Sequence, residues 1–203
     1  NEKLEPIPSL PLGTIEINII DLIKGYSTLA NEGNKITPHT IQRIEDYKGN
    51  ILYKNNNDSE YVLNKSITFI LNELLTSSYD INLVDYSYPT CLSIAPKISN
   101  KYAIKTGTTD TDVWIVGYNK DIILAMWNGY DNNKTTDLEI NKISKNIWID
   151  SIETYFKDKK ANWYDIPNNV IGVLVDPING NLVNDKSIKK KILYFIKGTE
   201  PTN

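Results

Sequence analysis

The sequence predicts an α/β (α+β) fold in which a mostly antiparallel sheet is flanked by helices. Three strand-like runs, at residues 102–106, 113–118 and 122–130, are rich in β-branched and aromatic residues. Residues 119–121 join the second run to the third so tightly that these two strands must be antiparallel. Three other segments repeat apolar residues every three or four positions, which is the period of a helix that packs through one face.

The first helix is expected over residues 19–30, after an extended, proline-rich entry. Asn18 is suited to cap its N-terminus, and Asp21 places a negative charge in the first turn, where the helix dipole is positive. Residues 31–33 (NEG) supply the glycine that ends the helix.

A hairpin is expected next. Residues 40–46 and 51–53 are its strands, and residues 47–50 (YKGN) form the turn between them. Residues 54–60 are polar and rich in asparagine, which predicts a loop.

Two further helices follow the hairpin. The second is expected over residues 67–75, with Asn64 as its cap. Residues 77–99 contain two prolines and read as loops with short helical pieces. The third helix is expected over residues 138–156. Its apolar side is expected to consist of Ile140, Ile143, Ile147, Ile152, Tyr155 and Phe156.

The chain divides at residue 160 into a main body, residues 1–160, and a C-terminal extension, residues 161–203. The extension holds a short apolar strand at residues 170–175 and a turn at residues 179–180 (NG). The basic stretch at residues 189–191 is interpreted as a solvated face.

Composition excludes several classes of protein. The formal net charge of −3 and a pI of about 5.3 argue against nucleic-acid binding through a broad basic surface. Cys91 is the only cysteine, so an internal disulfide, a CxxC zinc site and an iron–sulfur cluster are excluded. His39 is the only histidine and is interpreted as a surface residue, which leaves no multi-histidine metal site and no basis for a Ser-His-Asp triad. No apolar run approaches the roughly 18 residues of a membrane span.

One short segment contains the residues suited to bind a carboxylate and an oxyanion. Residues 105–108 (KTGT) end the first strand of the predicted sheet. The ammonium of Lys105 would attract a carboxylate, and the hydroxyls of Thr106 and Thr108 would donate hydrogen bonds to it. Gly107 lets a ligand lie against the strand backbone, and the amide of Thr108 would point at a developing oxyanion.

Each of these residues also has a purely structural interpretation. Lys105 would be a solvated lysine at a strand end, Thr106 and Thr108 ordinary strand formers, and Gly107 a bulge glycine. The three large aromatic residues on the same sheet could stack on a sugar, but core packing is the favoured interpretation for them. Those residues are Tyr118, Trp114 and Trp127.

Six segments, in order, make the chain resemble the transpeptidase domain of class A penicillin-binding proteins, which share a fold family with the serine β-lactamases. They match the family's PSLxLGT, AYxxxANxG, KTGTT, DxWxxGY and VWxGYD motifs and its common ending. In this sequence they are residues 8–14 (PSLPLGT), 25–33 (GYSTLANEG), 105–109 (KTGTT), 112–118 (DVWIVGY), 127–131 (WNGYD) and 198–201 (GTEP).

The resemblance implies a DD-transpeptidase site built from three motifs, SxxK, SxN and K[TS]G. Lys105, Thr106 and Gly107 match the third, and Thr108 matches the position whose amide completes the oxyanion hole. SxxK and SxN should precede residue 8, where this sequence does not hold them. Residues 187–190 and 144–146 fit the two spacings but follow Lys105, so we interpret them as accidental. Residues 1–160 are therefore expected to be the C-terminal part of the domain, without its nucleophile and inactive alone.

The function implied is serine acyl transfer from D-Ala-D-Ala stem peptides, which cross-links peptidoglycan outside the cytoplasmic membrane and is blocked by β-lactams. The expected partners are the stem peptide, β-lactams and the missing N-terminal part of the domain. No metal and no cofactor are expected. A class A parent would also carry a glycosyltransferase domain and a membrane anchor upstream. The alternatives are a non-catalytic penicillin-sensing or wall-binding module and, less favoured, a secreted β-lactamase.

Overall fold

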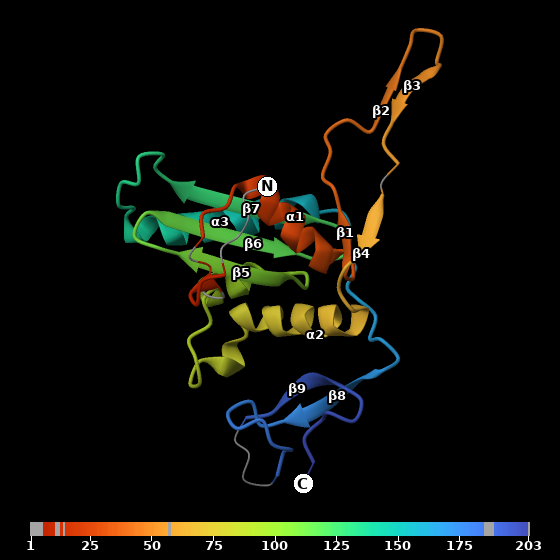
Figure 1. Ribbon diagram of the computed structural model, residues 1–203. Coiled ribbons are helices and arrows are strands. Elements are labelled where there is room, and N and C mark those ends of the chain that lie inside the picture. The colour runs from red at the N-terminus through yellow and green to blue at the C-terminus, as the bar shows by residue number, and fades with distance from the viewer. Residues whose placement is uncertain (1–5, 11–12, 14, 57, 185–188, 203) are drawn as a thin grey trace.

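The computed structural model describes residues 6–10, 13, 15–56, 58–184 and 189–202. Its centre is a three-stranded antiparallel sheet in the order β5-β6-β7, flanked by helices (Figure 1). The elements of this centre are α1 (Ile19–Ala30), α2 (Lys65–Leu75), β5 (Ala103–Thr108), β6 (Asp112–Tyr118), β7 (Ile123–Gly129) and α3 (Leu138–Tyr155). The predicted fold class, strand directions and three helices are confirmed.

The two caps proposed for the first helices are present. The side chain of Asn18 accepts a hydrogen bond from the Asp21 amide, and the side chain of Asn64 accepts from the amides of Ser66 and Ile67. Each cap satisfies backbone donors that have no partner inside the helix, which fixes where the helix begins.

The register of the sheet assigns its two faces to different helices. Ile104 lies opposite Gly117, and a Cβ on Gly117 would come within 2.3 Å of the Trp148 ring of α3. Tyr118, whose side chain points to the other face, lies 6.0 Å from the ring of Tyr26 on α1. Helix α3 therefore covers one face and α1 the other, as expected for a sheet with apolar strands.

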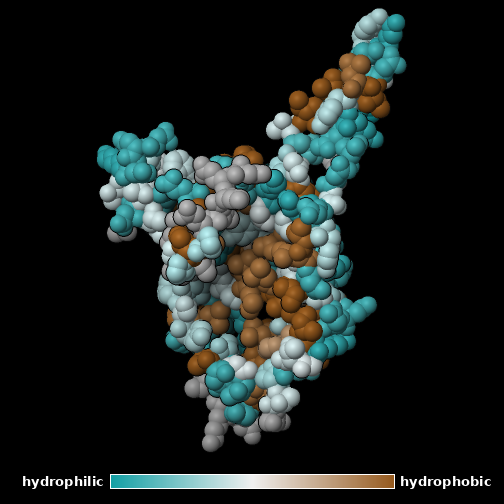
Figure 2. Space-filling model, viewed as in Figure 1, coloured by the Kyte–Doolittle hydropathy of each residue, from teal (hydrophilic) through white to brown (hydrophobic). Residues whose placement is uncertain are grey.

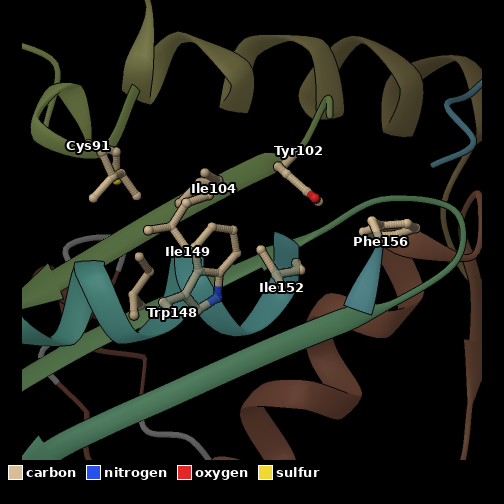
Figure 3. Packing of buried hydrophobic residues seen from close by; sticks show 9 residues of the cluster. Cys91, Tyr102, Ile104, Trp148, Ile149, Ile152 and Phe156 are labelled. Carbon is tan, nitrogen blue, oxygen red and sulfur yellow. The ribbon is translucent and has the colours of Figure 1, made fainter. Parts of the chain in front are cut away.

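The core lies between β5, β6 and α3 (Figure 3). Trp148 is fully buried there and donates from Nε1 to the Leu124 carbonyl at 2.9 Å. The prediction of the buried side of α3 was partly wrong, because that side centres on Trp148 and its neighbour Ile149 and leaves three of the six named residues exposed. The residues buried as predicted are Ile152 and Phe156, and the exposed ones are Ile143, Ile147 and Tyr155.

Short strands and turns complete the first half of the chain. β2 (Arg43–Glu45) and β3 (Ile51–Lys54) form the predicted hairpin, which projects from the body (Figure 1). β1 (Asn34–Ile36) pairs with β4 (Ser59–Tyr61), a pairing that corrects the expectation of a loop up to residue 60. The stretch before β5 contains three 3₁₀ helices, as the prolines predicted. They are η2 (Thr76–Tyr79), η3 (Ile81–Leu83) and η4 (Leu92–Lys97).

The C-terminal extension is a hairpin of β8 (Val170–Val175) and β9 (Lys191–Ile196). The expectation of a solvated basic stretch before β9 is wrong for two of its three lysines. Lys191 contacts Asp80 at 2.7 Å and Ser77 at 2.9 Å, and Lys189 contacts Asp85 at 2.8 Å. These acids lie in a stretch that the sequence separates from the lysines by about a hundred residues, so local patterning could not reveal them.

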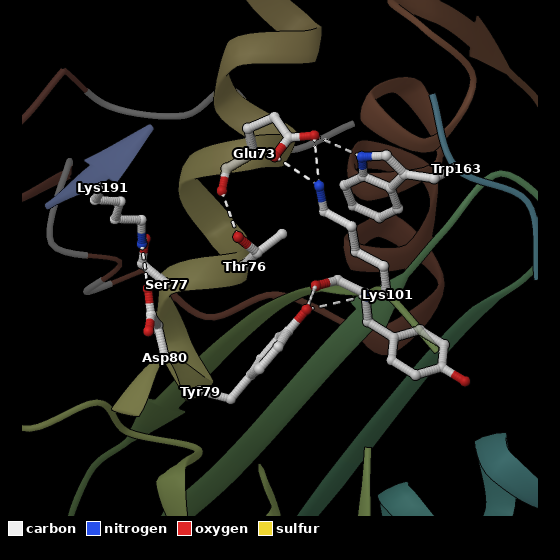
Figure 4. A network of polar contacts seen from close by, with 9 residues as sticks. Glu73, Thr76, Ser77, Tyr79, Asp80, Lys101, Trp163 and Lys191 are labelled. Atoms are coloured by element: carbon white, nitrogen blue, oxygen red, sulfur yellow. Dashed lines mark hydrogen bonds and ion pairs between the residues drawn. The ribbon is translucent and has the colours of Figure 1, made fainter. Parts of the chain in front are cut away.

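A second polar contact fastens the extension to α2 (Figure 4). The Glu73 carboxylate accepts from Lys101 at 2.7 Å and from the Trp163 indole at 2.6 Å. The Lys101 ammonium also lies 4.6 Å from the centre of the Trp163 ring. Trp163 and the lysines around the start of β9 thus contact the part of the chain that precedes β5.

Apolar side chains gather on one surface of the molecule, over α1 and α2 (Figure 2). Ile20 of α1 and Ile67 and Leu74 of α2 are more than 45% exposed. Contiguous apolar surface of this kind marks a contact region on a soluble protein.

Candidate functional site

The four predicted site residues end β5, and β5 is an edge strand. Among the residues that the structure describes, β5 pairs with β6 alone. The Thr109 amide donates to the Asp112 carbonyl at 2.9 Å, so the backbone groups of Thr109 face β6. Because this direction alternates along a strand, the amide and carbonyl groups of Thr106 and Thr108 face the open edge.

The position of the Lys105 side chain agrees with an outward-facing carbonyl at Thr106. Its Nζ lies 2.6 Å from the Thr106 carbonyl oxygen, which it can reach only if that oxygen points away from β6. The lysine is exposed and has no acidic partner within the described part of the chain. Its positive charge therefore remains available beside the edge.

The two threonine side chains lie on the opposite face of β5 from Lys105, toward α3. Alternation places them with Ile104, which packs in the core under α3. The cation and the two hydroxyls therefore reach a common edge from the two faces of the strand.

Gly107 is not required by the fold around it. Of the residues that the structure describes, a Cβ there would meet only Trp114, whose Cβ lies at an ordinary contact distance of 3.6 Å, and the backbone of Gly107 does not adopt a positive φ. Gly117, in contrast, has no room for a side chain because of Trp148. The absence of a side chain at 107 therefore keeps space clear outside the protein, beside the open edge.

Residues outside the KTGT segment hold its two hydroxyls. The Thr106 hydroxyl donates to the Thr90 hydroxyl at 3.1 Å, and Asn141 Nδ2 of α3 donates to the Thr108 hydroxyl at 3.0 Å. Lys145, one turn after Asn141, donates to the Thr90 carbonyl at 2.6 Å. Sequence reasoning missed Thr90, Asn141 and Lys145 because no motif or spacing relates them to the strand.

Asp112 organises the turn that follows Thr108. Its carboxylate accepts from the Thr111 hydroxyl and from the Trp127 indole, both at 2.7 Å. These hydrogen bonds hold the pKa of the carboxyl below its usual value. Trp127 also contacts Trp114, with ring centres 6.2 Å apart, and both indoles are half-buried.

The lone cysteine is buried, and the lone histidine lies on the surface as predicted. Cys91 is fully buried next to Thr90, and burial raises the pKa of its thiol. His39 is exposed in the arm that leads to the β2–β3 hairpin. Ser144 of α3 is buried and receives a hydrogen bond from Asn128, which fits its interpretation as an accidental match, whereas Ser187 lies outside the described residues.

The described residues contain no group of acidic, histidine or cysteine side chains arranged to hold a metal ion, and no helix long and apolar enough to cross a membrane. A hollow of about 510 Å³ lies near the C-terminal end of α3, where Asp150 and Glu153 contribute to its lining. Both acids already have partners within the chain, since Asp150 pairs with Lys97 and Glu153 accepts from the Ser99 amide.

Comparison with known proteins relates this geometry to one family. The chain is 37% identical over 201 residues to penicillin-binding protein 2D of Bacillus subtilis (strain 168), covering 98% of the chain. It is 30% identical over 204 residues to penicillin-binding protein 1A of Aquifex aeolicus (strain VF5), again over 98% of the chain. The chain is homologous to the penicillin-binding proteins. It spans 29% and 27% of the lengths of these two relatives.

The fold agrees with this penicillin-binding-protein homology. The crystal structure of penicillin-binding protein 1A from Haemophilus influenzae superimposes with a TM-score of 0.81, at 23% identity, over 96% of this chain and 34% of that one. No family model matches the chain. The family resemblance and the fold class predicted from the sequence are both confirmed.

Proposed function

We propose that residues 1–160 form the C-terminal part of a serine DD-transpeptidase domain and that residues 161–203 are an extension packed against it. The observation that carries the proposal is the open edge of β5, which presents Lys105, Thr106, Gly107 and the Thr108 amide together. Homology to penicillin-binding proteins over nearly the whole chain supports it. The parent protein would act in cell-wall synthesis outside the cytoplasmic membrane.

The edge suits an extended peptide or a β-lactam that imitates one. An extended ligand can pair with the outward-facing amide and carbonyl groups of Thr106 and Thr108 as an added strand. Its terminal carboxylate would lie near the Lys105 ammonium and the threonine hydroxyls, where charge-assisted hydrogen bonds are strongest. Gly107 allows that close approach.

In the proposed reaction a serine from polypeptide outside this sequence attacks the penultimate carbonyl of a D-Ala-D-Ala stem peptide. The carbonyl oxygen becomes an oxyanion, which the Thr108 amide would stabilise. The C–N bond then breaks, the peptide stays on the serine as an ester, and D-Ala leaves with the proton of the serine hydroxyl on its amine. An acceptor amine from a second strand attacks the ester, which forms the cross-link, and a proton of that amine returns to the released serine.

Intact-mass analysis of the full-length protein, with and without penicillin, tests this function. The expected result is one stable adduct of the mass of a single penicillin, which the 203-residue chain alone does not form. Reversible binding without an adduct would favour the alternative, a non-catalytic penicillin-sensing module. Rapid destruction of penicillin without a lasting adduct would favour a β-lactamase, and no binding at all would reject the ligand site.

A further inference from the structure

The Thr108 hydroxyl has a partner from an element far away in the sequence. Asn141 Nδ2 donates to Thr108 Oγ1 at 3.0 Å, and the two residues are 33 positions apart. Asn141 lies in the first turns of α3, where the Asp137 side chain caps the helix by accepting from the Glu139 amide. The donor is therefore on a fixed helix rather than on a loop.

The direction of this hydrogen bond decides what the hydroxyl can offer a ligand. A threonine hydroxyl has one hydrogen to donate and two lone pairs that accept. Because Asn141 supplies an N–H, the hydrogen of Thr108 cannot point at Asn141 and remains free. Thr106 differs, since its hydrogen is directed to the Thr90 hydroxyl.

We propose that Asn141 is a positioning residue that leaves the hydrogen of the Thr108 hydroxyl free to bind the carboxylate of the ligand. The inference rests on the proposed function and deepens it, because it names a residue outside the KTGT segment that orients the Thr108 hydroxyl toward the ligand. It also names α3 as an element that sets the specificity of the site for carboxylate-bearing ligands.

Asn141→Asp tests the proposal in the full-length protein. Aspartate has the same shape but only accepts hydrogen bonds, so Thr108 would turn its hydrogen toward residue 141 and present lone pairs to the ligand. The rate constant for acylation by a carboxylate-bearing penicillin is expected to fall about 10- to 100-fold, the effect of losing one hydrogen bond to a charged group. The melting temperature is expected to stay the same.

Two controls separate hydrogen-bond direction from added charge. Asn146→Asp adds the same charge on α3, next to Lys97, and is expected to leave acylation unchanged. In a Thr108→Val background, which lacks the hydroxyl, Asn141→Asp is expected to have less than about a threefold further effect. An equal loss in that background would show a charge or structural effect and overturn the proposal.

The outcomes also separate this inference from the function on which it rests. A wild-type protein that forms an adduct, together with Asn141→Asp acylated at the wild-type rate, would overturn the positioning role alone. A wild-type protein that forms no adduct would overturn the proposed function and the positioning role together.

Discussion

Lys105 and Lys191 lie in two regions of the molecule that use the same side chain in opposite ways. Lys191, at the start of β9, is 17% exposed and has both a carboxylate and a hydroxyl within 2.9 Å. Lys105, on β5, is exposed and contacts only a backbone carbonyl within the described part of the chain. Lys191 has its charge paired within the chain, whereas the proposed function gives the charge of Lys105 to a bound ligand.

The difference teaches which polar groups belong to stability and which to function. Removing one partner of a partly buried ion pair destabilises the fold, because the other charge is then left out of water without a partner. An exposed lysine with no acid partner contributes little to the free energy of unfolding. The extension is therefore expected to respond to mutation through stability, and the KTGT edge through ligand binding.

The largest effect on stability is expected from Glu73→Ala in the full-length protein. Glu73 is 13% exposed, and its loss would leave the Trp163 indole and the Lys101 ammonium without their acceptor. The free energy of unfolding should fall by about 2–3 kcal/mol, measured by urea denaturation. Glu60→Ala is the matched control, because its pair with Lys35 is exposed and should be worth less than about 1 kcal/mol. Equal losses from the two variants would contradict the structural role of Glu73.

Gly107→Val is expected to affect ligand binding and not stability. The side chain would project into the space beside the open edge, and a misfit of about 1–3 kcal/mol corresponds to about a 10- to 100-fold slower acylation. The free energy of unfolding should change by less than about 0.5 kcal/mol. Gly117→Ala is expected to lower the free energy of unfolding, because its Cβ would clash with Trp148. A Gly107→Val protein that unfolds easily would show that the fold itself needs this glycine.

Lys191→Met is expected to lower stability and leave ligand binding unchanged, which is the reverse of the Gly107→Val prediction. It removes two contacts of β9 with the segment before β5, and should lower the free energy of unfolding by about 1 kcal/mol while acylation stays at the wild-type rate. Lys190→Met, at an exposed neighbouring position, should change stability by less than about 0.5 kcal/mol. Slower acylation by Lys191→Met would contradict the separation of the two regions.

The smallest effect is the pH dependence of the Lys191 contact. Partial burial raises the pKa of Asp80, but the hydrogen bond from Lys191 and the donors of Asn82 outweigh it and leave that pKa below the usual value. A carboxyl with a lowered pKa stabilises the fold above the pKa of the unfolded chain, near 4, and loses this contribution as the pH falls through the folded pKa. The destabilisation by Lys191→Met should therefore be complete at pH 7 and become smaller as the pH falls from about 4 through the lower pKa of the folded Asp80 carboxyl. A constant difference over this pH range would exclude Asp80 as its partner.

The parts of the fold that local physics determines could be predicted from the sequence. Asn18 and Asn64 cap helices as proposed because a cap depends on a few neighbouring residues. The buried face of α3 was only partly predicted, because the pattern of isoleucines gave no weight to Trp148, which fills the space beside Gly117. The β1–β4 pair was missed because three-residue strands are too short to show alternation.

The candidate site shows the same division. Residues 105–108 carry a motif that the sequence alone could single out. Thr90 and Asn141, which hold the two hydroxyls, reach them only through tertiary packing across 16 and 33 positions. The partners of Lys189 and Lys191 were hidden for the same reason, so a solvated basic stretch was the wrong interpretation for both.

Acylation of the full-length protein by a fluorescent penicillin, compared between Lys105→Met and Lys191→Met, tests the central claim most directly. Both variants remove one ammonium and keep the apolar stem. Lys105→Met should be acylated about 10- to 100-fold more slowly than the wild type with its stability unchanged, while Lys191→Met should be acylated at the wild-type rate. Acylation of Lys105→Met at the wild-type rate would contradict the assignment of the β5 edge as the ligand site.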